Sequence, residues 1–172
     1  MWYLFELTKN DKWKTEAQKF TAKIEQVKLN VKTHDMGFKT YISFGNSYRL
    51  TKNNHDSEVI IQSAKTLVTP FNPMVGAIRL WDHNAHKWDF PVIIDNMLNL
   101  ELLFEATKLT GNSTFYKIAL SHANTNLKNH FRPDFSTWHV IGYNTITGAV
   151  EKNHASGFFR FFNVGSWNGL GA

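Results

Sequence analysis

The chain has 172 residues, 42% hydrophobic and 15% aromatic, a composition that fits a folded globular protein and excludes a disordered one. Its formal net charge is +5, but the lysines are scattered, so a solvated surface explains the charge and we do not expect nucleic-acid binding. The absence of cysteine excludes disulfides and thiolate metal sites, and no apolar run reaches the roughly 18 residues of a membrane span.

Helical patterns dominate the chain. Met1–Leu7 reads as the interior of a helix, so we expect a sequence that is cut at its start, and both a periplasmic and a cytoplasmic location stay open. Further helices are predicted where apolar residues recur every three or four positions: Asp11–Gln26, Met36–Leu50, Asp56–Thr69, Val92–Leu109 and Ser113–His130. Pro91 suits the first turn of the helix that follows it, because its missing N–H needs no partner there.

An internal repeat groups these helices in pairs. Leu4–Asn10, Tyr48–Asn53 and Leu103–Thr107 resemble one another, and in each case a helix ends in a short polar turn before a second helix. Repeated antiparallel helix pairs predict a helical array or an α/α toroid.

Two stretches interrupt the helical pattern. Residues 71–90 are predicted to form a long loop with a short strand inside Val75–Trp81, where apolar residues alternate. Ser136–Val150 is predicted to be a β-hairpin with its turn near Asn144–Gly148. Long loops on a helical scaffold are where functional sites tend to lie.

Two aspartates are candidates for acid–base chemistry. Asp95 lies in a strongly apolar segment, where loss of hydration favours the protonated form of a carboxyl group and makes it a plausible proton donor. The alternative is an acid held near a helix N-terminus by backbone dipoles. Asp35 lies just before a predicted helix, and on local grounds its favoured role is to cap that helix. Two carboxyl groups are, however, what acid–base catalysis on a sugar usually needs.

Histidine and tryptophan supply weaker signals. No HExxH spacing is present among the histidines, so we expect no metal site. His139 lies on the predicted hairpin and faces either a site or solvent. Trp81 and Trp88 flank a polar segment, where they either form a wall for stacking or pack in the interior.

Four collinear strings resemble the unsaturated glucuronyl hydrolases, glycoside hydrolase family 88. They are T-H-D-M-G-F at 33–38, S-F-G-N-S-Y-R-L-T at 43–51, V-I-I-D-N-M-L-N-L-E-L-L-F at 92–104 and S-H-A-N-T-N-L-K-N-H-F-R-P-D at 121–134. The resemblance runs from about Leu4 to Lys152. The related unsaturated rhamnogalacturonyl hydrolases resemble these strings less well.

The resemblance implies an all-α fold, an (α/α)6 barrel of which this chain would form about half, together with the long loop and the short hairpin. It also implies an enzyme that acts on oligosaccharides left by polysaccharide lyases and hydrates the C4=C5 double bond of their terminal unsaturated glucuronic acid. No cofactor, metal, nucleic acid or membrane is expected, and the oligomeric state is not predicted.

Roles for individual residues follow from the same resemblance. Asp95 matches the general acid/base of the family, and Asp35 matches the assisting carboxylate, with His34 beside it. His139 matches a histidine near the sugar, and Trp81 matches a stacking tryptophan.

The resemblance ends after Lys152. Family members continue with a segment such as N-T-H-Q-G-x-x-D-x-S-x-W-A-R-G-Q-A-W-G, and a one-base shift in a possible coding of the tail gives T-H-Q-G-F-S-D-F-S-T-W-A-R-G-M-A-W-G. We therefore divide the chain into a partial barrel domain, residues 1–153, and a frameshifted tail, residues 154–172, while a genuine Gly/Phe-rich tail is the alternative. The lost segment holds the family's glutamine, arginine and tryptophan that bind the uronate, so the chain is expected to be inactive alone.

A second hypothesis is a non-catalytic helical-repeat module that binds sugar or protein through its concave face. Replacing both Asp35 and Asp95 by asparagine separates the two hypotheses, because binding that survives unchanged favours the module.

Overall fold

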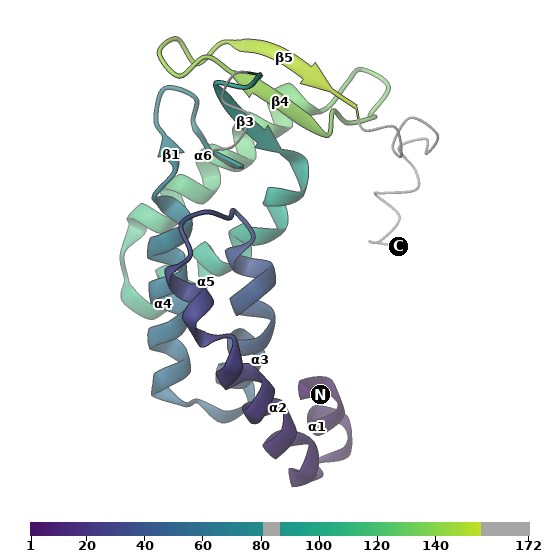
Figure 1. Ribbon diagram of the computed structural model, residues 1–172, viewed down its shortest axis with the longest axis vertical. Coiled ribbons are helices and arrows are strands. Elements are labelled where there is room, and N and C mark those ends of the chain that lie inside the picture. The colour runs from purple at the N-terminus through teal and green to yellow at the C-terminus, as the bar shows by residue number, and fades with distance from the viewer. Residues whose placement is uncertain (81–86, 156–172) are drawn as a thin grey trace. The chain divides into compact units, whose positions relative to one another are not determined.

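The computed structural model describes residues 1–80 and 87–155, which form two compact units. The first unit comprises residues 1–69 and 98–116, and the second comprises residues 70–97 and the chain from 117 onward. Figure 1 labels the α-helices and most of the strands of the two units.

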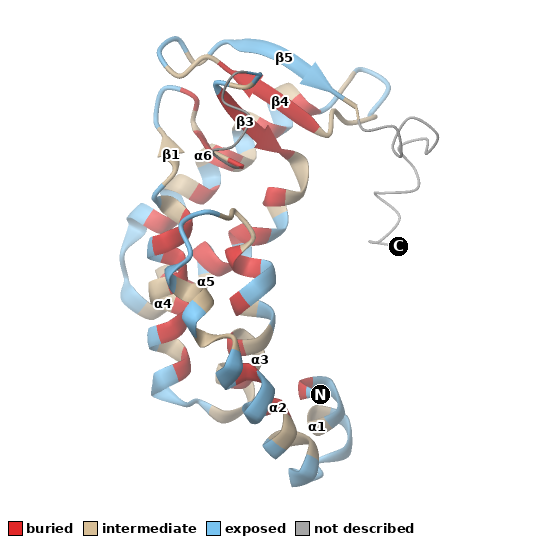
Figure 2. Ribbon diagram, viewed as in Figure 1, coloured by how far each residue is buried: buried red, intermediate tan, exposed pale blue. Residues whose placement is uncertain are grey.

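The first unit is made of helices that pack in succession. They are α1 (Trp2–Thr8), α2 (Asp11–Lys23), a 3-10 helix (Glu25–Leu29), a π-helix (Gly37–Tyr41), α3 (Ile42–Thr51), α4 (Asn54–Val68), α5 (Leu100–Thr110) and the start of α6 (Ser113–His130). α4 packs against both α3 and α5. Phe44 of α3, Ile60 of α4 and Leu103 of α5 are buried. Figure 2 shows buried positions in red on all three helices. Of the helices that the structure describes, none is both long and apolar enough to cross a membrane.

One connection occurs three times, and it coincides with two of the three copies of the internal repeat, because the third copy ends at Thr107 inside α5. α1, α3 and α5 each end at a threonine, followed by a residue of left-handed conformation and then an asparagine: Thr8-Lys9-Asn10, Thr51-Lys52-Asn53 and Thr110-Gly111-Asn112. The threonine hydroxyl accepts a hydrogen bond from the asparagine N–H, and the asparagine carboxamide oxygen accepts one from an N–H in the first turn of the next helix. The motif therefore stops one helix and starts the next within two residues, which reverses the chain and confirms the predicted helix pairs.

The second unit contains two small antiparallel sheets. Its strands are β1 (Phe71–Asn72), β2 (Ala77–Ile78), β3 (Phe90–Ile93), β4 (Val140–Tyr143) and β5 (Val150–His154). β1 pairs with β2, and the larger sheet has the order β3-β4-β5. β3 and β4 are buried along their whole length, whereas β5 is exposed, as Figure 2 shows. The short strand predicted in the loop is thus present as β2, and the Trp81 end of that prediction lies outside the described residues.

The predicted hairpin is present with its turn where predicted, but its second strand, β5, begins only at Val150, where the prediction ended. Asn144 N–H donates to the Ala149 carbonyl, and Gly148 N–H donates back to the Asn144 carbonyl, so the turn falls where the turn residues lie. Gly148 has φ +70°, a conformation that glycine adopts without steric cost.

The start of the predicted helix at Val92 is wrong. Residues 90–93 form strand β3, a 3-10 helix (Ile94–Asn99) follows, and α5 begins only at Leu100. Pro91 lies in β3, not in a first helical turn. It is tolerated because β3 is an edge strand and the Pro91 backbone faces away from β4, its carbonyl accepting a hydrogen bond from Leu80 N–H. Val92 and Ile93 pair with Ile141 and Val140 of β4, since β-branched side chains suit a buried strand.

Candidate functional site

The predicted site residues fall in both units. His34 and Asp35 belong to the first unit, and Asp95 and His139 belong to the second. Trp81 lies outside the described residues. Trp88, its neighbour in the loop, packs against Leu80, Ile93 and Val140.

Asp35 is surrounded by cationic and polar side chains at the start of the segment that leads into α3. Its Oδ1 lies 2.8 Å from His34 Nε2, and its Oδ2 lies 3.7 Å from Lys39 Nζ and 3.3 Å from the Thr33 hydroxyl. Lys39 Nζ also donates to the Thr33 hydroxyl at 2.9 Å. The Asp35 side chain is 33% exposed, so it is oriented by its neighbours and still open to a ligand.

These contacts argue against a capping role for Asp35. The partners of its carboxylate are the side chains of Thr33, His34 and Lys39. In the first turn of the π-helix that begins at Gly37, the Phe38 N–H donates to Asn99 Oδ1 and not to Asp35. Asp35 N–H instead donates to Thr33 Oγ1 at 3.1 Å. The carboxylate is therefore left available for a role outside the helix start.

Asp95 lies in the 3-10 helix directly after β3 and is partly buried. Its Oδ1 atom is buried and has no hydrogen-bond partner among the described residues. A buried carboxyl oxygen without a partner is costly unless the group is protonated or a ligand supplies the missing bond. Asp95 Oδ1 is thus an acceptor that a bound ligand would satisfy, which keeps Asp95 a candidate site residue.

His139 is the neighbour that the fold brings to Asp95. Ile94 N–H donates to the His139 carbonyl at 3.0 Å, which sets the two segments side by side, and His139 N–H donates to His154 of β5. Burial lowers the pKa of His139, the Asp95 carboxylate opposes that shift, and His154 adds to it. Its imidazole is therefore mainly neutral at neutral pH, next to a carboxyl group.

Two residues that sequence reasoning did not assign, His130 and Arg132, hold the segment that leads into His139. His130 Nδ1 lies 2.9 Å from the Trp138 carbonyl, and Trp138 N–H donates to the His130 carbonyl. The Arg132 guanidinium lies 4.0 Å from the Trp138 ring centroid and donates to the Thr137 carbonyl. His130 and Arg132 both lie in the string at 121–134, which the sequence marks as a motif without indicating what its members do.

His130 should make the stability of the folded chain depend on pH. Burial lowers the pKa of His130 from 6.5 to about 4. Between these two pH values the imidazole takes up a proton in the unfolded chain but not in the folded chain. The free energy of unfolding has its full value above pH 6.5 and falls by up to about 3 kcal/mol as the pH drops towards 4. Urea unfolding at several pH values measures this loss.

The contribution of His130 is isolated by comparing two variants. His130→Asn should flatten the pH dependence, whatever its stability at neutral pH, whereas replacement of the half-exposed His55 by asparagine should leave it in place. An unchanged pH profile in the His130 variant would show that the buried imidazole is not the titrating group.

No cluster of three or more possible metal ligands is found within residues 1–80 and 87–155. His122 illustrates why many histidines need not mean a metal site. It is fully buried, and its Nδ1 accepts a hydrogen bond from Ile78 N–H, so it ties α6 to β2.

Comparison with known proteins finds close relatives by sequence, although no protein-family model matches the chain. The chain is 52% identical over 162 residues to the unsaturated glucuronyl hydrolase of Formosa agariphila, a match that covers 93% of this chain and 40% of that protein. It is 28% identical over 156 residues to the unsaturated chondroitin disaccharide hydrolase of Streptococcus pneumoniae, covering 88% of this chain and 39% of that one. The chain thus spans about 40% of the length of the relatives that it matches.

Solved structures agree with the sequence comparison. An unsaturated glucuronyl hydrolase specific for heparin matches with a TM-score of 0.84 and 42% identity, over 88% of this chain and 40% of its own. The enzyme from Streptococcus agalactiae matches with a TM-score of 0.84 and 27% identity, over 90% of this chain and 40% of its own. These enzymes are α/α barrels, which confirms the predicted fold class, part of an α/α barrel with small sheets.

Two further structures of the Streptococcus agalactiae enzyme carry one aspartate-to-asparagine substitution each. The two substituted aspartates are as far apart in that sequence as Asp35 and Asp95 are in this chain.

Proposed function

The chain belongs to the unsaturated glucuronyl hydrolase family, and on that basis we propose that the complete protein hydrates the C4=C5 double bond of a terminal unsaturated glucuronic acid. The substrates would be oligosaccharides left by polysaccharide lyases. The observation that carries the proposal is the buried Oδ1 of Asp95, which has no hydrogen-bond partner within residues 1–80 and 87–155 and lies next to the His139 segment.

The reaction adds one water molecule to an enol ether. Asp95, in its protonated form, donates a proton to C4 while water adds at C5, and a carboxylate takes up the proton that this water loses. The product is a hemiketal, which opens and releases the shortened sugar, and the anomeric carbon is never attacked. A carboxyl group with restricted hydration suits both proton transfers.

The other residues have supporting roles in this proposal. Asp35, placed between His34 and Lys39, assists as a second carboxylate, and the lysine and imidazole keep its oxygens oriented. His139 contacts the sugar as a neutral donor or acceptor. Trp81 stacks on a sugar ring.

A hybrid protein tests the proposal. Residues 1–153 replace the matching segment of the Formosa agariphila relative, and the hybrid is assayed with unsaturated disaccharides from chondroitin and from heparin. We expect loss of the ultraviolet absorbance of the conjugated double bond with the hybrid and none with the 172-residue chain. A folded hybrid that consumes neither disaccharide would refute the proposed activity.

A comparison that includes ligand binding tests the non-catalytic alternative. The unsubstituted hybrid is compared with a hybrid in which both Asp35 and Asp95 are replaced by asparagine. If both bind the disaccharides equally well and the unsubstituted hybrid has no turnover, the chain is a binding module.

A further inference from the structure

Lys39 places a positive charge against the carboxylate of Asp35. It belongs to the π-helix (Gly37–Tyr41), and its N–H donates to the Asp35 carbonyl at 2.9 Å. Its Nζ lies 3.7 Å from Asp35 Oδ2. The main chain and the side chain of Lys39 are therefore both fixed relative to Asp35. π-helical turns are rare and are frequent at functional sites, which directs attention to this one.

The ammonium group of Lys39 has hydrogen-bonding capacity to spare. It has three N–H donors, and it donates one of them to the Thr33 hydroxyl at 2.9 Å. The distance of 3.7 Å to Asp35 Oδ2 is that of an ion pair and is longer than a hydrogen bond. Within residues 1–80 and 87–155 these are the contacts of Nζ, and the side chain is 43% exposed. A ligand can therefore reach Lys39 and accept a hydrogen bond from it while Thr33 stays bound.

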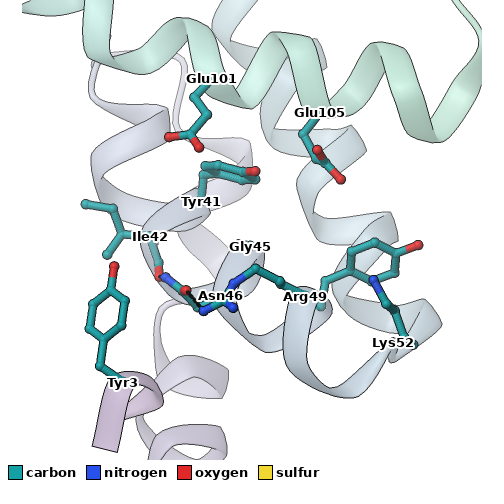
Figure 3. A pocket seen from close by; sticks show the side chains of 10 residues that line it. Tyr3, Tyr41, Ile42, Gly45, Asn46, Arg49, Lys52, Glu101 and Glu105 are labelled. Carbon is teal, nitrogen blue, oxygen red and sulfur yellow. Dashed lines mark hydrogen bonds between the residues drawn. The ribbon is translucent and has the colours of Figure 1, made fainter. Parts of the chain in front are cut away.

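The two other cations of the segment 37–52 are engaged differently. Arg49 binds Glu6 through two hydrogen bonds of 2.6 Å, and Lys52 Nζ lies 5.1 Å from the Tyr48 ring centroid. Figure 3 shows Arg49 and Lys52 in the lining of a cavity of about 430 Å³, which also contains two glutamates of α5. Carboxylates of the chain itself thus accompany these two cations. Lys39 is the cation of this segment that lies beside a candidate catalytic group.

The charge of the proposed substrate gives a cation at this position a use. An unsaturated glucuronic acid carries a carboxylate, and fragments of sulfated polysaccharides carry sulfate groups as well. The Asp35 carboxylate alone would repel such groups, because like charges a few ångströms apart repel each other. Lys39 offsets this repulsion and offers an N–H donor, and hydrogen bonds between an ammonium group and an anion are among the strong ones.

We propose that Lys39 is a substrate-binding residue that donates a hydrogen bond to an anionic group of the sugar, a carboxylate or a sulfate. The inference rests on the proposed function in taking the substrate to be an acidic oligosaccharide. It gives Lys39 a role beyond orienting Asp35, because it makes this lysine a determinant of specificity for charged over neutral sugars.

The test measures binding to the hybrid protein that also carries Asp95→Asn, so that the ligands are not consumed. Calorimetry gives the Kd of three unsaturated disaccharides: a sulfated one, an unsulfated one, and the uncharged methyl ester of the unsulfated one. Lys39→Met should raise the Kd of at least one charged disaccharide about tenfold and that of the ester less than about twofold. Lys39→Arg keeps the charge and should retain most of the affinity. Lys19→Met, at an exposed lysine of α2, is the control and should change none of the three Kd values.

The three ligands also identify the anionic group. A loss of affinity with both charged disaccharides assigns Lys39 to the carboxylate, and a loss with the sulfated disaccharide alone assigns it to the sulfate. Added salt provides a second measurement. Binding of the affected disaccharide should weaken more steeply with salt in the parent than in the Lys39→Met variant, because the variant lacks the charge that salt screens.

Three results would overturn the proposal. They are Kd values that Lys39→Met leaves unchanged for both charged disaccharides, an equal loss of affinity for the neutral ester, which would limit Lys39 to orienting Asp35, and a folded hybrid that binds none of the ligands. None of these readouts needs turnover. Binding that depends on Lys39 as expected, in a hybrid that consumes no disaccharide when Asp95 is present, would refute the proposed activity and leave the Lys39 contact intact. Turnover combined with binding that ignores Lys39 would do the reverse.

Discussion

Asp95→Asn should lower kcat of the active hybrid by a factor of about 10² to 10⁴ while changing KM little, because an amide can neither donate the proton to C4 nor take one from water. The change is nearly isosteric. It also leaves the β3–β4 pairing next to Asp95 intact, since Ile94 and His139 are joined through their backbones. Initial rates with the unsaturated disaccharide measure the effect.

Asp89→Asn is the matched control in the same unit. Asp89 is exposed, and its Oδ2 accepts hydrogen bonds from the Thr145 N–H and hydroxyl, a partnership that also lowers its pKa. Its replacement should cost some stability of the loop and leave kcat within a few-fold. Equal rates for Asp95→Asn and the parent hybrid would remove Asp95 from the mechanism.

Gly37→Ala should destabilise the first unit by about 1–3 kcal/mol, although alanine is the better helix former. A Cβ atom at Gly37 would lie 2.7 Å from Asn99 Oδ1 and 2.9 Å from Asn99 Cα, and the second of these is a backbone atom that cannot rotate away. The same contact holds the hydrogen bond from Phe38 N–H to Asn99 Oδ1, at 3.1 Å. The substitution should therefore disturb the segment that follows Asp35.

Gly111→Ala separates steric cost from conformational cost. Gly111 has φ +69°, and a Cβ atom added there would meet no atom beyond its chain neighbours within 4 Å. Only the left-handed backbone therefore opposes the change, at about 1 kcal/mol. Urea unfolding of both variants gives the comparison. A Gly37→Ala chain that is as stable as the parent, or more stable, would mean that Asn99 does not approach the π-helix this closely.

Short-range signals of the helix pairs were readable in the sequence. The Thr-x-Asn connections carry their own stop and start signals, because the hydroxyl and the carboxamide bond to backbone groups within a few residues. The hairpin turn at Asn144–Gly148 was predictable for the same reason. Each of these structures depends on neighbours in the sequence.

Strand β3 could not be recognised in the same way. The Val-Ile-Ile run after Pro91 fits a buried strand and a buried helix equally, and local periodicity does not distinguish them. The choice is made by pairing with Val140–Tyr143, a segment far along the chain. The error at Val92 follows from this, because strand pairing is a long-range interaction.

The features of the candidate site also fall into those that the sequence determined and those that required the tertiary structure. The sequence alone determined the residue types, the helix pairs and the family, and through the family it pointed to Asp35, Asp95, His34, His139 and Trp81. Only the tertiary structure decided that Asp95 has a buried oxygen with no partner in the described part of the chain, beside the His139 segment, and that His130 and Arg132 hold Trp138 next to it. Burial and electrostatic surroundings are properties of packed neighbours, so they exist only once distant segments have been brought together.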